Sequence, residues 1–245
     1  MKILVCISKV PDTTTKINFV DDNTRFDTNN VQFIINPLDE FALTRAIELI
    51  EAGEGSVEVI NVGGVDTEPI IRKALALGAE EAIRVDAEPT DSFFVATQIA
   101  HFAKVGEYDI VLTGRETIDF NGSQVGGMIA AMLDIPFISG VSSLELNGNE
   151  ATFHREIEGG KEVVTSSIPF VASAQEGITT PRIPNMRGIM SARTKPLKVE
   201  QPVSDEKLTS NNLFESPPAK GECVFIDSET PEKLVELLHS EAKVI

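Results

Sequence analysis

Short apolar runs alternate with amphipathic segments along the chain up to Pro136. The apolar runs are short and rich in branched residues, and they occupy residues 2–7, 57–62, 82–85 and 109–113. Runs of this kind are typical of strands buried on both faces of a sheet. The segments between them space their apolar residues as helices do, and they cover residues 37–50, 68–77, 91–105 and a stretch after Ser123. The alternation predicts an α/β fold with a doubly wound, mostly parallel sheet and helices on both faces.

Residues that favour helix starts and stops mark the ends of two of these helices. Asn36 stands as the N-cap of the first helix, Pro37 takes its first position, and Asp39 follows in its first turn. These choices suit the positive, hydrogen-bond-donating end of a helix. Gly78 is expected to end the helix over residues 68–77.

After Pro136 the pattern changes to short runs separated by turns. The runs lie at residues 141–146, 151–157 and 162–167. Asn147-Gly148 and Gly159-Gly160 stand between them and favour tight turns, so an antiparallel hairpin is expected here. One more buried strand is predicted over residues 169–174.

Alternating runs near the start of the chain predict a second hairpin. They cover residues 17–20 and 31–35, and a stretch rich in Asp, Asn and Thr separates them. Polar turn residues between two alternating runs are a hairpin signal.

Residues 177–199 form a basic loop that contains prolines but no acidic residue. Its cations are Arg182, Arg187, Arg193, Lys195 and Lys198, and its apolar residues include Ile183, Met186, Ile189 and Met190. In an acidic protein, such a loop is either a docking surface for a partner or a solvated linker.

The remaining residues, 200–245, are expected to form an arm outside a nucleotide-binding domain of residues 1–199. Prolines and polar residues predict an extended course. Residues 223–227 are expected to form an edge strand, and Thr230-Pro231-Glu232 to start an amphipathic terminal helix. An arm of this kind often lies on a partner subunit.

Charge and cysteine usage narrow the class of protein. The chain has 38 acidic and 21 basic residues and a net charge of −17, which argues against binding to nucleic acid or to anionic membranes. Cys6 and Cys223 are far apart, which argues against a disulfide framework and fits a reducing compartment. No apolar run is long enough for a signal sequence or a membrane span. We therefore expect a cytoplasmic protein without membrane insertion.

The polar loop that starts at Gly114, after the strand at residues 109–113, is the strongest candidate site. A strand, a loop rich in glycine and hydroxyl groups, and a helix start can present backbone N–H groups to a phosphate. The same residues also suit a plain helix N-cap and close helix packing. Asp119 has two interpretations, a ligand of a ribose hydroxyl or the cap of a turn.

Sequence motifs of enzymes are absent, and we expect no catalytic residue and no metal site. The chain has no GxSxG, GxxxxGK[ST], GxGxxG or HExxH sequence. Its three histidines are scattered and are interpreted as structural. Cys6 is interpreted as a small core residue rather than a nucleophile.

Several segments together carry a resemblance to a known family. They are VCISKVPD at residues 5–12, RKALALGAEEAIRV at 72–85, GRETIDFNGSQVGG at 114–127, HREIEGGKE at 154–162 and PRIPNMRGIM at 181–190. In their order and spacing, these segments make the chain similar to the β subunit of electron transfer flavoprotein, nearly from end to end.

The resemblance implies a fold like that of adenine-nucleotide hydrolases and universal stress proteins, and a role in electron transport. It implies a heterodimer with an α subunit that holds FAD at the interface. Electrons would come from flavoprotein dehydrogenases, such as the acyl-CoA dehydrogenases of fatty acid oxidation, and pass to a membrane quinone oxidoreductase. Two alternatives are an NADH-dependent bifurcating subunit and a stand-alone adenine-nucleotide-binding stress-type protein.

The resemblance also implies a nucleotide site in this chain, which holds AMP in most members and a second FAD in bifurcating ones. Its residues here would be Cys6, Lys9, Asn36, Val62, Gly114, Asp119, Gly122, Ser123, Gln124, Val125 and Gly126. The stretch Gln124-Val125-Gly126 resembles the bifurcating members slightly more, and Gly127 replaces their proline.

By the same resemblance, the basic loop is the family's recognition loop for dehydrogenases. Met186 would be the apolar anchor, with Ile183, Arg187 and Ile189 around it. Arg187 and the basic residues beyond it would steer the encounter and make contacts at the rim. The arm would wrap the α subunit.

Overall fold

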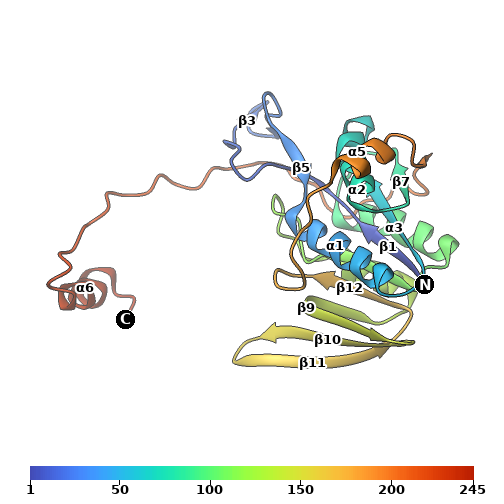
Figure 1. Ribbon diagram of the computed structural model, residues 1–245. Coiled ribbons are helices and arrows are strands. Elements are labelled where there is room, and N and C mark those ends of the chain that lie inside the picture. The colour runs from blue at the N-terminus through green and yellow to red at the C-terminus, as the bar shows by residue number, and fades with distance from the viewer.

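A nine-stranded sheet forms the centre of the computed structural model, which describes residues 1–245 (Figure 1). The strands lie in the order β11-β10-β9-β12-β8-β1-β6-β7-β13. The five inner strands, which carry the site described below, are β1 (Lys2–Cys6), β6 (Ser56–Val62), β7 (Glu81–Val85), β8 (Ile110–Gly114) and β12 (Phe170–Ala174). Across the sheet, every pair of neighbouring strands in the series β9-β12-β8-β1-β6-β7-β13 is parallel. The predicted mostly parallel sheet is therefore confirmed.

Helices cover both faces of this sheet, as the alternating pattern predicts. One face carries α1 (Pro37–Glu51) and α2 (Glu68–Leu77), and the other carries α3 (Ser92–Gly106) and α4 (Val125–Leu133). In β1, Ile3 and Val5 join the core under α1 and α2, while Leu4 and Cys6 join the core under α3 and α4. A strand with both faces buried needs the continuous apolar run that this segment has.

The order of the strands creates a switch point between β1 and β8. After β1 the chain builds β6 and β7 on one side, and then returns to place β8 on the other side of β1. The chain segments that follow β1 and β8 lead away from each other, toward opposite sides of the sheet. The carboxyl ends of these two neighbouring strands therefore border a crevice. Open α/β sheets bind their ligands at such a point.

The predicted hairpin region is also confirmed. Its strands are β9 (Phe137–Asn147), β10 (Glu150–Ile157) and β11 (Gly160–Ser167), and they pair antiparallel at one end of the same sheet. Gly148 and Gly159 have φ values of 61° and 83°, a conformation that glycine adopts without strain.

The predicted hairpin between residues 17–20 and 31–35 is wrong in its pairing. β3 (Phe19–Val20) pairs with β4 (Arg25–Phe26), whereas β5 (Phe33–Ile35) pairs with β2 (Lys9–Pro11). The residues from Asp21 to Asn23 all have φ between 53° and 62°, so the chain reverses directly after β3. This early reversal brings residues 25–26, and not 31–35, opposite β3.

The C-terminal part of the chain differs from expectation in two places. Beyond the short helix α5 (Met186–Ala192), an unexpected strand β13 (Leu197–Glu200) extends the sheet beside β7. The expected edge strand at residues 223–227 is wrong, because these residues lie in the arm away from the sheet and pair with no strand (Figure 1). The terminal helix α6 (Glu232–Leu237) is present, and one π-helical segment, Leu238–Ala242, follows it.

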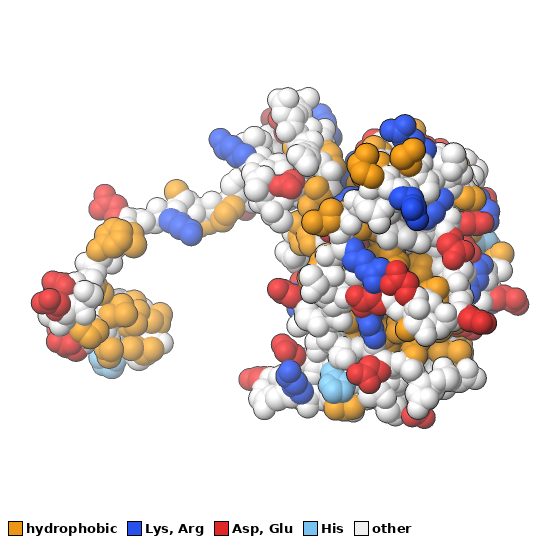
Figure 2. All heavy atoms as spheres, viewed as in Figure 1, with side chains coloured by type: hydrophobic (Ala, Val, Ile, Leu, Met, Phe, Trp, Pro, Cys, Tyr) orange, Lys and Arg blue, Asp and Glu red, His pale blue; other side chains and the backbone are white.

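The arm touches the body only in its first part and then extends away from it (Figure 1). Gln98 bonds the backbone of Val203 and Ser204, and Asp91 accepts the N–H groups of Leu208 and Thr209. No residue from 201 to 245 is buried. Apolar side chains crowd the surface of α6 at the far end (Figure 2). None of the helices is long and apolar enough to cross a bilayer.

Candidate functional site

The crevice at the switch point is held together by Asp39, in the first turn of α1. Its Oδ2 accepts the backbone N–H of Ser8 at 2.8 Å, and its Oδ1 accepts that of Gly114 at 2.9 Å. These two residues follow β1 and end β8, so one carboxylate links both borders of the crevice. Burial raises the pKa of Asp39 to about 7, although its hydrogen bonds act in the opposite direction.

Asn36 connects α1 to the polar loop on the other side of the crevice. It occupies the N-cap position as predicted, but its side chain makes no capping bond. Instead, Nδ2 donates to the carbonyl of Glu116 at 2.8 Å, and Oδ1 accepts the N–H of Ile118 at 3.2 Å. The capping interpretation of its side chain is therefore wrong, since the amide is committed to the loop.

The start of α4 lies directly over the end of β8. Gly126, in the first turn, is buried, and a side chain there would come within 3.0 Å of Thr113 Oγ1 and 2.9 Å of the Phe137 ring. The hydroxyl of Thr113 is buried and has no hydrogen-bond partner in the protein. Buried polar groups are normally paired, and the first N–H groups of a helix also lack partners. Polar groups without partners therefore lie together where β8 ends and α4 begins.

A second unpaired polar atom lies nearby on β6. Asn61 Nδ2 donates to the carbonyl of Ile7 at 2.9 Å, whereas its Oδ1 is buried without a partner. Gly63 passes so close that a side chain there would come within 2.8 Å of that oxygen. An unpaired acceptor at the ends of β1 and β6 suits a ligand that carries an N–H donor, as an adenine ring does.

The sequence-predicted cofactor residues all gather at this edge of the sheet. Cys6, Val62 and Gly114 end their strands, Lys9 follows β1, Asn36 precedes α1, and residues 119–126 lead into α4. The Cys6 thiol is buried and burial raises its pKa, as expected of a core cysteine. Lys9 pairs with Asp66 and lies 4.3 Å from the centre of the Phe33 ring, so its charge is already partnered.

The loop itself is open to solvent. Asp119, Gly122, Ser123 and Gln124 are exposed, and Asp119 makes no side-chain hydrogen bond, so neither of its two interpretations gains a contact here. Sequence reasoning missed Asp39, Asn61 and Thr113 as site residues. The only available signal was a polar residue within an otherwise apolar strand, as in VEVINV for Asn61 and IVLTG for Thr113.

The basic loop is fixed to the body at both of its ends. On its first side, Arg182 makes two bonds to the Glu51 carboxylate at 2.7 and 2.6 Å. On its other side, Lys195 donates to the carbonyls of Leu75 and Ala79 at the end of α2, at 2.8 and 2.6 Å. Arg72 of α2 also donates to two carbonyls of the loop.

These contacts change which cations of the loop are free. Arg182, Lys195 and Lys198 are all engaged within the chain, the last with Glu81 at 2.7 Å. The expectation that Arg187 and the basic residues beyond it serve a partner stays a prediction, and of these residues Lys195 and Lys198 already have partners within the chain. Arg187 and Arg193 make no ion pair.

Between its fixed ends, the loop exposes a group of apolar side chains. Ile183 is 91% exposed, Met186 74% and Met190 68%. Apolar and basic side chains lie next to each other over α5 in Figure 2. Exposed apolar groups rimmed by charge are typical of a surface that another protein covers.

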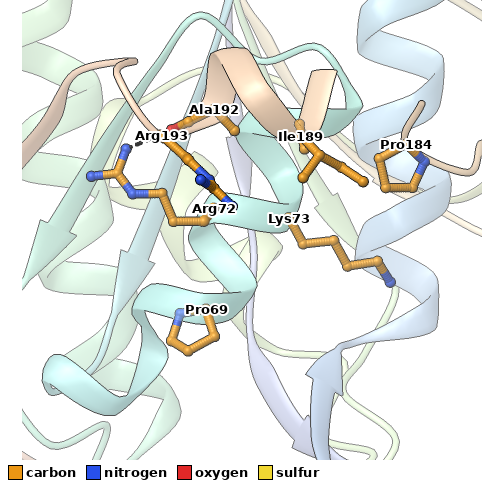
Figure 3. A pocket seen from close by; sticks show the side chains of 8 residues that line it. Pro69, Arg72, Lys73, Pro184, Ile189, Ala192 and Arg193 are labelled. Carbon is orange, nitrogen blue, oxygen red and sulfur yellow. Dashed lines mark hydrogen bonds between the residues drawn. The ribbon is translucent and has the colours of Figure 1, made fainter. Parts of the chain in front are cut away.

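A shallow pocket of about 360 Å³ lies between α2 and this loop (Figure 3). Its lining residues are Pro69, Arg72, Lys73, Ala76, Pro184, Ile189, Ala192 and Arg193. Arg72 is bonded to Ala192 across the pocket, and Lys73 pairs with Glu40. The pocket therefore has apolar walls and one unpaired cation, Arg193.

Comparison with known proteins relates this chain to one family. Residues 24–205 match a family described as "Electron transfer flavoprotein domain". The chain is 34% identical over 260 residues to "Electron transfer flavoprotein subunit beta" of Bacillus subtilis, with all of both chains covered. It is 35% identical over 250 residues to the protein of the same name from Syntrophomonas wolfei, with 100% and 98% of the two chains covered. The mitochondrial subunit beta of Arabidopsis thaliana is 32% identical over 257 residues.

Proposed function

The chain belongs to the electron transfer flavoprotein family as a relative of its beta subunits, and from this premise we propose that it forms a heterodimer with an alpha subunit. The heterodimer carries electrons from flavoprotein dehydrogenases, such as acyl-CoA dehydrogenases, to a membrane quinone oxidoreductase. Proteins of this family transfer electrons and are not enzymes in themselves. The exposed free thiol of Cys223 supports a reducing compartment, the cytoplasm.

The arm supports the heterodimer. It exposes Val224, Phe225, Leu234 and Val235, and Phe225 is 91% exposed. Apolar side chains contribute a favourable free energy when they are removed from water, and those of the extended arm are exposed. We propose that the arm packs on the alpha subunit, which holds the FAD, and that this FAD supplies the redox chemistry.

The crevice supports a bound adenine nucleotide, with AMP as the first candidate. The observation that carries this proposal is the unpaired hydroxyl of Thr113 beneath the first turn of α4. The helix start and Thr113 would hold the phosphate, and Ser123 lies at the entry to that helix. Asn61 and the backbone after β1 and β6 would hold the adenine. AMP has a structural role in this proposal, because it fills a site that the protein leaves with unpaired polar atoms.

The basic loop supports docking of the dehydrogenase. Met186 is the proposed anchor, since methionine adapts its shape to several partners. Ile183 and Ile189 lie beside it, and Arg187 and Arg193 supply the free positive charge that would meet an acidic rim. The fixed ends of the loop keep this group in one place on the surface.

Extraction of nucleotides from the purified heterodimer tests the proposal. We expect one FAD and one AMP per heterodimer, identified by chromatography after denaturation with acid. Two FAD molecules would instead favour the NADH-dependent bifurcating form. A stable colourless protein that needs no alpha subunit would contradict the heterodimer and favour a stand-alone nucleotide-binding protein.

A further inference from the structure

The carboxylate of Glu116 occupies the loop in which the proposed phosphate site lies. Its Oε2 accepts the hydroxyl of Ser123 at 2.6 Å, and its Oε1 accepts Nη2 of Arg115 at 2.5 Å. The side chain is only 16% exposed, although it belongs to an otherwise open loop. A negatively charged group of the protein thus holds the two side chains of this loop that an anionic ligand would use.

The backbone around Glu116 is fixed from the side of α1. Asn36 accepts the N–H of Ile118 and donates to the carbonyl of Glu116, so the amide brackets this residue. Ser123 has a φ of 51°, a left-handed conformation, within the turn that leads into α4. The backbone conformation of the loop thus places Ser123 next to Glu116, and their hydrogen bond joins the two ends of the loop.

The site beyond this contact still offers groups for an anion. α4 has nine residues, and its first turn covers the unpaired and buried hydroxyl of Thr113. The ion pair of Glu116 with Arg115 neutralises the only cation within the loop. Hydrogen bonds from Ser123 and Arg115 also hold the pKa of Glu116 below its ordinary value, so the carboxylate is ionised at neutral pH.

We propose that Glu116 is a specificity-determining residue that limits how much negative charge the nucleotide site accepts. The inference rests on the proposed function, because it concerns the same crevice. Glu116 cancels the charge of Arg115, and the attraction that a free arginine would exert grows with the negative charge of the ligand. The site therefore takes an adenine nucleotide with one phosphate and rejects nucleoside di- and triphosphates.

Nucleotide binding to Glu116→Gln tests this inference. Glutamine keeps an oxygen that can accept the Ser123 hydroxyl, but it removes the charge and releases Arg115. We expect the variant heterodimer, stripped of nucleotide, to bind ADP and ATP at least tenfold more tightly than the wild type in calorimetric titration. AMP should gain less, and adenosine should bind equally to both proteins. The gain should shrink at high salt.

Two further variants separate the possible causes. Glu158→Gln, in the turn between β10 and β11, removes the same charge far from the crevice and should leave every affinity unchanged. Adding Arg115→Gln to Glu116→Gln should remove most of the gain for ADP and ATP. The inference is overturned if all phosphates gain equally, if adenosine changes with them, or if no affinity changes.

The two proposals fail in different ways. If the wild type contains AMP and Glu116→Gln titrates as the wild type does, only the role of Glu116 is overturned. If no protein, wild type or variant, binds any of the four ligands, the nucleotide site itself is overturned.

Discussion

Asp39 accepts the backbone N–H of Gly114 at 2.9 Å, and this bond links the first turn of α1 to the end of β8. The carboxylate that makes it is buried, and burial raises its pKa from 3.8 to about 7. A group whose pKa is raised on folding binds its proton more tightly in the folded state. The stability that it contributes is therefore present below pH 4 and is lost as the pH rises through about 7.

We accordingly expect the free energy of unfolding to fall between pH 5 and pH 8, by on the order of 3 kcal/mol at most. The other carboxylates with shifted pKa values have lowered ones and stay ionised across this window, so they do not contribute to the slope. Urea unfolding at several pH values measures the effect. Asp39→Asn should be less stable at every pH, since its amide cannot accept both N–H groups, and it should lose the slope. A variant with the wild-type slope would contradict the assignment to Asp39.

Thr113→Val should separate stability from binding. The wild-type hydroxyl is buried without a partner, and an unsatisfied polar group of this kind costs about 1–3 kcal/mol. Valine has nearly the same shape, so we expect the nucleotide-free protein to gain about 1 kcal/mol in urea unfolding and to bind AMP more weakly. Thr67→Val is the matched control, because the Thr67 hydroxyl already donates to Gly64 and its loss should destabilise the protein. Unchanged AMP affinity in Thr113→Val would remove this hydroxyl from the site.

Lys195→Met should loosen one end of the basic loop. The ammonium group donates to two carbonyls at the end of α2, and bonds of charged donors at a helix C-terminus are stabilising. We expect a loss of about 2 kcal/mol and faster amide exchange in α5, while the end fixed by Arg182 keeps its protection. Lys198→Met removes an exposed pair with Glu81 and should cost less than about 0.5 kcal/mol. Equal losses in the two variants would show that Lys195 is no anchor.

The main sheet was predictable because its inner strands are buried on both faces. Strands such as β1 and β8 then need continuous apolar runs, which are visible in the sequence without knowledge of their neighbours. β13 was missed because three of its four residues, Leu197–Glu200, are exposed, so its side chains leave no such signature. β13 pairs with β7 through backbone hydrogen bonds, and these can form with almost any side chains, so they leave no pattern in the sequence.

The site was predictable in place but not in its contacts. Glycines and hydroxyl residues after a strand indicated the loop at Gly114, but nothing in the sequence indicated that Asn36 would bond this loop rather than cap its helix. The unpaired atoms of Asn61 and Thr113 depend on neighbours that are distant along the chain, as Ile7 is for Asn61. Likewise, Lys195 and Arg187 look alike in sequence, and only the packing on α2 distinguishes the anchor from the free cation.

Met186→Ala should slow reduction of the heterodimer by its dehydrogenase. The side chain is 74% exposed on a loop held at both ends, so it can be buried on docking without moving the backbone. Burying a methionine contributes about 1.5–3 kcal/mol, which corresponds to roughly a 10- to 100-fold loss in kcat/KM when the side chain is removed. Reduction kinetics with the dehydrogenase measure this loss. Met132→Ala, on α4 and 37% exposed, is the control and should reduce at the wild-type rate. Flavin content should be the same in all three proteins, because Met186 lies outside the crevice and the arm, and a lower content in Met186→Ala would assign the effect to assembly instead of docking.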